Sequence, residues 1–291
     1  MKQARPMSER TLRFALFLVR ITPRWLGYPL ATLAGRLFGW LNREYRGIIE
    51  SNLEAVCGQP DRRRLRRVAV EAFATATRSY YELLYMPLIP PKRILSLVQF
   101  EEPGWTQFQE AHRAGNGLVV AAPHLGSFDL AGQSLVASGL RVLVLALPDQ
   151  AAGFAFMNKM RAFQQGGDVA PTGPAALLKA VRTLREGNIV ATGADRPIKG
   201  QGTVVEFFGR PTLLPDGHVR LALRTGAALF LTPCWREKGR HHLAFQRIKR
   251  AQTGDEEADV RDTLQRFAWA MEPFIRAHPE QWHLLIRLWG E

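Results

Sequence analysis

Residues 117–129 read Gly117-Leu-Val-Val-Ala-Ala-Pro-His124-Leu-Gly-Ser-Phe-Asp129, an apolar run that ends in polar side chains. Val119–Ala122 show no polar alternation, which is typical of a strand covered on both faces. Pro123 and Gly126 then break the run, after which a helix can begin. This order predicts a buried strand with polar residues at its carboxyl end, where open α/β sheets usually place their sites.

The polar end of this run contains a His-x4-Asp pair, His124 and Asp129. A neutral imidazole has an unperturbed pKa of about 6.5, so it can remove a hydroxyl proton at neutral pH. Its other ring nitrogen must then be held by an acceptor such as Asp129. The reaction that this pair suggests is acyl transfer to an alcohol. A histidine that caps a helix, with an aspartate in the first turn, is the structural alternative, and the spacing alone leaves both open.

Strands and helices alternate from Gly117 onward, which predicts an α/β fold with a single sheet flanked by helices. The predicted strands are Leu118–Ala122, Val142–Leu147, Asn188–Thr192, Val204–Phe208, Ala228–Pro233 and His242–Arg247. The predicted helices among and after them include Asp129–Ser138, Phe154–Gln164, Pro174–Arg185, Gly217–Thr225 and Asp259–Ala277. The residues before Gly117 are predicted to be mostly helical.

The amino-terminal segment is apolar but interrupted by charge. Between residues 12 and 41 it is rich in Leu, Phe and Trp, whereas four arginines and two helix-breaking residues, Pro23 and Pro29, divide it. No run reaches the roughly 18 apolar residues of a transmembrane helix. We therefore expect amphipathic membrane-docking helices in residues 1–43 and an α/β domain in residues 44–291. Packing of these apolar residues onto the α/β domain is the alternative.

The chain is strongly basic, with 39 Lys and Arg against 26 Asp and Glu and a formal net charge of +13. Such an excess favours a polyanion as partner, either nucleic acid or an anionic membrane surface. The sequence contains no helix-turn-helix, zinc or RNA-binding signature, so we expect the membrane and no nucleic acid. The histidines outside the run above do not have the spacing of a metal site, and no metal or cofactor is expected.

Six segments resemble a known family, and they follow one another in the family's order along nearly the whole chain. They are Tyr45–Leu53, Arg78–Tyr81, His124–Asp129, Gly193–Arg196, Val204–Gly209 and Pro279–Trp282. The chain resembles the lipid A biosynthesis acyltransferases (the lauroyl and myristoyl transferases), and most of all the phosphatidylinositol mannoside acyltransferases of the same superfamily. The resemblance implies a glycerolipid-acyltransferase-like fold at the cytoplasmic face of the cell inner membrane. It also implies transfer of a fatty acyl group from acyl-CoA or acyl carrier protein to a glycolipid hydroxyl, without a cofactor.

Two acids are candidates for the partner of His124. Asp195 follows the apolar residues Ile189–Ala191, and the resemblance implies that an acid at this position pairs with the base. We favour Asp195 as the direct partner, with Asp129 in a supporting or acceptor-orienting role. An ion pair between Asp195 and Arg196 is the alternative.

The remaining candidates would bind the substrates. Backbone amides of Gly126 and Ser127, at a predicted helix start, could stabilise the oxyanion. The resemblance implies that Arg161 faces the acyl donor, and Arg196 is a candidate for a phosphate of the acceptor. Strand alternation places the side chain of Glu206 on the face opposite to Val205 and Phe207, so it lies either in the substrate-binding cleft or in water.

Departures from the family pattern favour the mannoside branch. Lipid A transferases commonly have glutamate where this chain has Asp129, and Asp-Gln-Asp where it has Ala194–Arg196. A non-catalytic membrane-binding relative of the same fold and a lysophospholipid acyltransferase remain as alternatives. A serine hydrolase with Ser127 as nucleophile is disfavoured, because the Gly-x-Ser-x-Gly elbow is missing.

Overall fold

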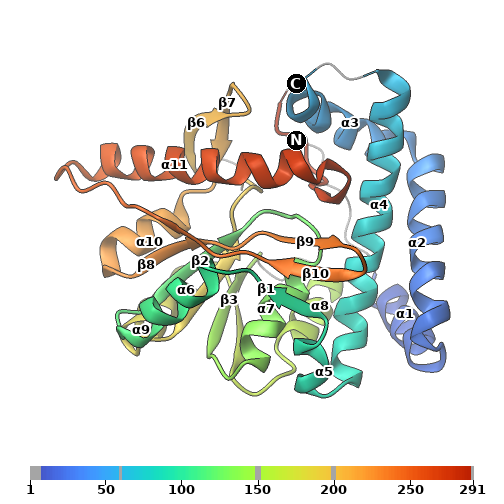
Figure 1. Cartoon of the computed structure of the whole chain (residues 1–291), viewed down its shortest axis with the longest axis horizontal. Coiled ribbons are helices and arrows are strands. Elements are labelled where there is room, and N and C mark those ends of the chain that lie inside the picture. Colours follow the sequence, from blue (N-terminus) through green and yellow to red (C-terminus); the bar gives the residue numbers. More distant parts are fainter. Residues whose placement is uncertain (1–7, 59–60, 148–151, 198–200, 290–291) are drawn as a thin grey trace.

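A six-stranded sheet forms the centre of the computed structural model, which describes residues 8–58, 61–147, 152–197 and 201–289 (Figure 1). The strand order is β11-β8-β2-β5-β3-β4, and all neighbours are parallel except β11 and β8. In sequence order the strands are β2 (Leu118–Ala122), β3 (Val142–Ala146), β4 (Gly167–Pro171), β5 (Ile189–Gly193), β8 (Ala228–Leu231) and β11 (Gln246–Ile248). The strand before His124 therefore lies in the middle of the sheet.

Helices cover both faces of this sheet. The helices that follow the amino-terminal region are α5 (Pro91–Leu95), α6 (Gly104–Arg113), α7 (Phe128–Ala137), α8 (Ala152–Arg161), α9 (Pro174–Arg185), α10 (Gly217–Thr225) and α11 (Glu256–Ala277). Leu118 and Val120 pack with α6 and α7 on one face, whereas Val119 and Ala121 pack with α9, α10 and α11 on the other. This explains why the strand is apolar at every position.

Two smaller sheets correct the prediction of a single sheet. The first has the order β1-β10-β9, with β1 (Val98–Phe100), β9 (Cys234–Glu237) and β10 (Arg240–Leu243). The second is a hairpin of β6 (Thr203–Phe207) and β7 (Arg210–Leu214), so the predicted strand Val204–Phe208 lies outside the main sheet. The predicted strand His242–Arg247 is also wrong. It is divided between β10 and β11, because the chain changes sheets where Phe245 enters an aromatic cluster with Trp105 and Phe108.

The first third of the chain is helical, as predicted. It contains α1 (Glu9–Ile21), α2 (Arg24–Leu41), α3 (Arg43–Cys57), α4 (Arg62–Tyr85) and the 3-10 turn η1 (Met86–Leu88). In Figure 1 α2 runs alongside α4, and three glycines of α2 allow this close approach. A Cβ atom at Gly35 would lie 2.6 Å from the carbonyl oxygen of Phe73. The prediction that Pro29 breaks the helix is wrong. α2 continues through Pro29, because packing on α4 holds the helix on both sides of it.

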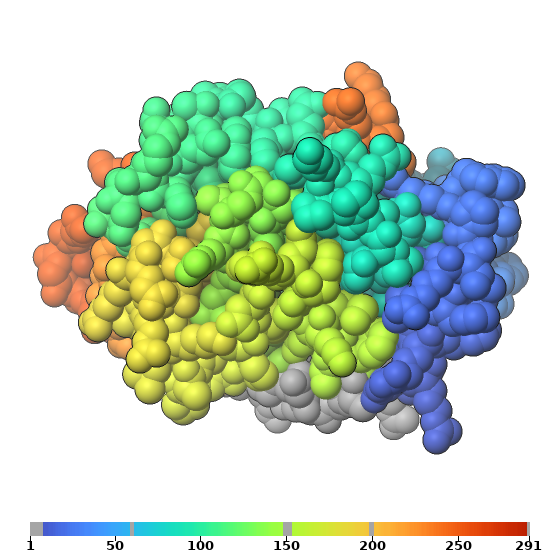
Figure 2. Space-filling view, turned by 90° about the horizontal axis from the view of Figure 1, so that it is seen from below, coloured from blue at the N-terminus to red at the C-terminus, as the bar shows by residue number. Residues whose placement is uncertain are grey.

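The outward side of α1 and α2 exposes a set of large apolar side chains, called here the apolar ridge. It comprises Phe14, Phe17, Leu18, Ile21, Trp25, Leu26, Leu30, Leu33, Leu37, Phe38, Trp40 and Leu41. In the space-filling view these helices, in blue, form one side of the molecule (Figure 2). Within the described residues, no helix combines the length and the apolar character that crossing a membrane requires.

Candidate active site

His124 and Asp195 meet at the carboxyl ends of two neighbouring strands. β2 and β5 are parallel and in register, with Ala122 opposite Gly193, so the residues that follow them leave the sheet side by side. His124 Nδ1 lies 2.6 Å from Asp195 Oδ1, and the backbone N–H of His124 donates to Asp195 Oδ2 over 2.8 Å. Of the two candidate acids, the structure brings Asp195 to the histidine.

Asp195 is fully buried, whereas the side chain of His124 is 24% exposed. Burial acts to raise the pKa of Asp195, but the charge of His124 and the hydrogen bonds of the carboxylate outweigh it and lower the pKa. Asp195 is therefore an ionised acceptor. Because Nδ1 faces this carboxylate, the ring carries its proton there, and Nε2 keeps a free lone pair.

A segment near residue 282 fixes both members of this pair. The indole N–H of Trp282 donates to Asp195 Oδ2 over 2.8 Å. Trp282 also forms an isolated β-bridge with Leu125, and the N–H of His283 donates to the carbonyl of His124 over 3.1 Å. We call residues 281–283, which begin at the last residue of the 3-10 turn η2 (Pro279–Gln281), the clamp segment. It holds the histidine loop against β5.

One of the two predicted oxyanion donors is engaged within the fold. The N–H of Gly126 donates to the carbonyl of Gln281 over 2.9 Å. Gly126 has φ +55°, and a Cβ atom there would lie 2.4 Å from the carbonyl oxygen of Cys234, so this turn requires glycine.

The amides of the first turn of α7 are a further set of candidate oxyanion donors. The first intrahelical bond runs from Ala131 to the carbonyl of Ser127, so the preceding amides have no intrahelical acceptor. Ser127 provides no side-chain cap for them. The helix dipole further favours negative charge at this end.

Asp129 and Arg161 form a two-pronged ion pair with each other. Nε of Arg161 lies 2.6 Å from one carboxylate oxygen, and a terminal nitrogen lies 3.2 Å from the other. Burial acts to lower the pKa of Arg161, but Asp129 outweighs it and raises the pKa. Asp129 is therefore not bonded to His124, and the guanidinium of Arg161, expected at the acyl donor, is bound to this carboxylate.

The last two predicted residues differ in their surroundings. Arg196 is partly buried, which lowers its pKa, while Tyr80 and Asp195 act to raise it. Within the described residues no ion pair joins it to Asp195, whose oxygens bond to His124 and Trp282. Glu206 is exposed on the β6–β7 hairpin, and its backbone bonds to Gln265 of α11. Its side chain is turned to the solvent side.

The sequence pattern of a known family, described as "Bacterial lipid A biosynthesis acyltransferase", matches residues 11–291. The chain belongs to this family. A phosphatidylinositol mannoside acyltransferase of Mycobacterium tuberculosis is 29% identical over 248 residues, which are 83% of this chain and 76% of that protein. The protein of the same name from Mycolicibacterium smegmatis is 28% identical over 250 residues, 83% of this chain and 78% of the relative. The predicted resemblance is confirmed.

The clamp segment is the part of this family member that the sequence did not assign. Pro279–Trp282 resembles a family segment, but its composition indicates no chemistry. The available signal was a tryptophan in a short polar segment after a long helix, because a buried indole N–H usually finds an acceptor. That signal does not identify the acceptor, which lies 87 residues earlier in the chain.

Proposed function

We propose that this acyltransferase moves a fatty acyl group from an acyl-CoA or acyl carrier protein thioester to a hydroxyl of a membrane glycolipid, with His124 as general base. The observation that carries the proposal is the 2.6 Å contact between His124 Nδ1 and Asp195 Oδ1. The two relatives described above are named for transfer to a phosphatidylinositol mannoside, which supports a glycolipid acceptor of that type. The description of the family names lipid A biosynthesis, which also supports an acceptor of the lipid A type.

In the proposed reaction, Nε2 of His124 accepts the hydroxyl proton of the acceptor as its oxygen attacks the thioester carbonyl. The new C–O bond forms, the C–S bond breaks, and the proton passes from His124 to the departing thiolate. Asp195 keeps the imidazole in the required tautomer and stabilises its charged form. A thiolate leaves readily, so no covalent acyl-enzyme is needed. The first turn of α7 is our candidate for stabilising the oxyanion.

We further propose that the protein works at the cytoplasmic face of the cell inner membrane and docks through the apolar ridge. Trp25 and Trp40 of the ridge are 76% and 58% exposed. Exposed apolar patches of such size commonly mark a protein or membrane interaction site, and the net charge of +13 favours an anionic surface. Together they support a membrane partner.

The test is free-thiol release from palmitoyl-CoA or a palmitoylated carrier protein, in detergent with membrane lipid extract, followed by mass spectrometry of the lipids. Wild-type protein should release thiol and yield an acylated glycolipid, and His124→Ala should do neither while its unfolding temperature stays near the wild-type value. Activity above a few per cent in the variant would remove His124 as the base. An acylated lysophospholipid would assign the acceptor to the lysophospholipid class. Thiol release from neither donor would favour a non-catalytic relative.

A further inference from the structure

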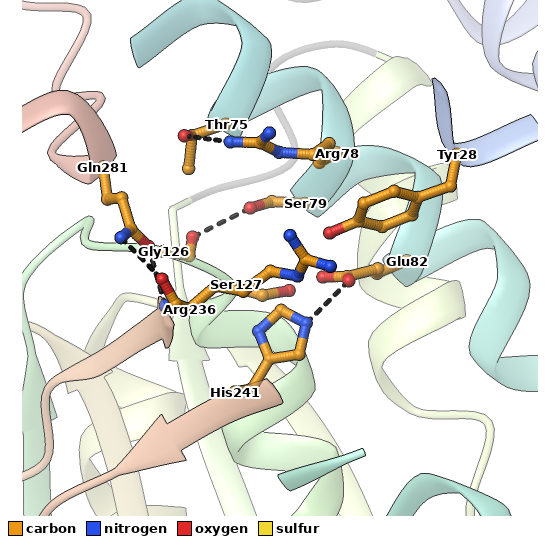
Figure 3. A pocket seen from close by; sticks show the side chains of 10 residues that line it. All are labelled: Tyr28, Thr75, Arg78, Ser79, Glu82, Gly126, Ser127, Arg236, His241 and Gln281. Carbon is orange, nitrogen blue, oxygen red and sulfur yellow. Dashed lines mark hydrogen bonds and ion pairs between the residues drawn. The ribbon is translucent and has the colours of Figure 1, made fainter. Parts of the chain in front are cut away.

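A polar pocket is lined in part by Gly126 and Ser127 of the loop after His124, and neither His124 nor Asp195 lines it (Figure 3). The residues used below come from five parts of the fold. They are Tyr28 of α2, Arg78 and Glu82 of α4, Ser127 beside α7, Arg236 of β9 and His241 of β10. None of the roles proposed above uses these side chains.

Two guanidinium groups of this pocket have no carboxylate partner within the described residues. Arg78 donates to the hydroxyl of Thr75 over 2.8 Å, and Arg236 lies over the ring of Tyr28, 5.0 Å from its centre. No ion pair is formed by either arginine with a described residue. A partly buried guanidinium without a counter-ion is a strong donor for a phosphate or carboxylate oxygen.

The pocket contains one acid, which is already paired. Glu82 Oε1 lies 2.8 Å from His241 Nε2, and both side chains are buried. Burial acts to raise the pKa of Glu82, but its interactions with His241 and other neighbours outweigh this and lower it, so the acid is ionised. Two guanidinium groups against one carboxylate leave the pocket with a net positive charge.

Several polar atoms at the floor of the pocket have no hydrogen-bond partner. They include Glu82 Oε2, His241 Nδ1 and the hydroxyls of Ser127 and Tyr28. A buried polar group without a partner is unfavourable, so the floor favours an occupant with polar atoms.

We propose that Arg78 and Arg236 bind the phosphate group of a membrane lipid headgroup at the open side of this pocket, whose interior of about 10 Å³ has room for about one water molecule. The planar guanidinium matches phosphate oxygens in geometry and charge. Tyr28 links the pocket to α2, whose outward side carries the apolar ridge, so a headgroup phosphate and acyl chains could contact one helix on opposite sides. Phosphate binding does not depend on the proposed reaction, whereas the membrane lipid as its source depends on the proposed membrane docking.

The experiment is calorimetric titration of the full chain in non-ionic detergent with three probes: dihexanoyl phosphatidic acid, dihexanoylglycerol and inorganic phosphate. The variants are Arg78→Gln and Arg236→Gln. Arg240→Gln is the matched control, because Arg240 is an exposed arginine at the start of the neighbouring strand β10. His124→Ala is included to separate this site from catalysis.

We expect phosphatidic acid to bind and dihexanoylglycerol not to bind. Arg78→Gln and Arg236→Gln should each weaken the affinity for phosphatidic acid about tenfold or more, because each removes charged hydrogen bonds. Arg240→Gln and His124→Ala should leave it within about twofold, even where His124→Ala abolishes thiol release. Inorganic phosphate binding as tightly, with the same loss in the two variants, supports the site and assigns it to free phosphate.

Equal affinity of wild type, Arg78→Gln and Arg236→Gln for phosphatidic acid would overturn the proposal, as would absence of binding by both phosphate probes. Thermal unfolding of each variant, compared with that of Arg240→Gln, shows whether it is folded. If a glutamine variant is not folded, Arg78→Lys or Arg236→Lys replaces it. Lysine keeps the charge but loses the planar fork, so binding should be weakened and not abolished.

Discussion

Trp282 donates its indole N–H to Oδ2 of Asp195, the carboxylate oxygen that the ring of His124 does not contact. Trp282→Phe should keep most of the ring volume and leave a buried carboxylate lone pair without its donor. Because Asp195 would then be held less firmly, we expect kcat to fall about tenfold while KM changes little. Steady-state kinetics of thiol release measure kcat and KM separately. A change confined to KM would argue against a positioning role for the indole.

Asp195→Asn should be more damaging than the loss of its indole partner. The amide can present its NH2 group to Nδ1 of His124, which would favour the proton on Nε2 and remove the base. We expect kcat to fall by at least about 10²-fold, consistent with the large losses seen when a histidine base is held in the wrong tautomer. Circular dichroism and thermal unfolding serve as folding controls. Near wild-type turnover would show that Asp195 does not orient the base.

The ion pair of Asp129 and Arg161 should behave as one buried unit. Removing either partner alone leaves a charge without its counter-ion, which typically costs about 3–5 kcal/mol of unfolding free energy. Asp129→Asn and Arg161→Gln should each destabilise the fold, and the double variant should be less destabilised than the sum of the two. Urea denaturation of all four proteins completes this cycle. Additive effects would mean that the two side chains do not depend on each other.

Glu82 should contribute stability that is lost in acid. Its pKa is lower in the folded protein than the roughly 4.3 of an exposed glutamate, so its stabilising contribution is present above about pH 4.3. The contribution is lost as pH falls through the lower folded-state pKa. Unfolding free energies measured between about pH 3 and pH 7 should therefore decline less steeply in Glu82→Gln than in wild type. Parallel curves for the two proteins would contradict the lowered pKa.

Membrane docking through the apolar ridge should be sensitive to single charges. Trp25→Glu and Leu33→Glu change exposed side chains, so the unfolding temperature should stay near the wild-type value while flotation with anionic vesicles falls several-fold. Leu178→Glu, at a 74% exposed leucine of α9, is the matched control and should float like wild type. Equal flotation of all three variants would exclude the ridge as the docking surface.

The strand-end rule predicted the centre of this site well. β2 occupies its predicted residues, and β5 lies within one residue of the predicted strand, so the residues that follow them meet as the parallel order requires. These strands are apolar because helices cover both faces, and that pattern is visible in the sequence. The choice of Asp195 over Asp129 as the neighbour of His124 is likewise what strand ends indicate.

Other elements could not be predicted from the local sequence. β4 has the sequence Gly167-Asp-Val-Ala-Pro171, whose Gly, Asp and Pro disfavour a strand, and it forms because β3 provides a parallel partner at the sheet edge. The engagement of the Gly126 amide depends on Gln281, which is distant in sequence. Tertiary contacts of this kind leave no periodic pattern, so the clamp segment and the polar pocket required the structure.

The position of the clamp segment late in the sequence determines when the site can form during synthesis. Trp282 lies 87 residues after Asp195, so during synthesis both members of the proposed dyad leave the ribosome long before the indole that braces them. A nascent chain that has not yet reached Trp282 can form β2 and β5 but cannot complete the network around Asp195. We therefore expect the site to be completed among the last events of folding. The arrangement of His124 and Asp195 is then fixed only after the rest of the acyltransferase domain has folded.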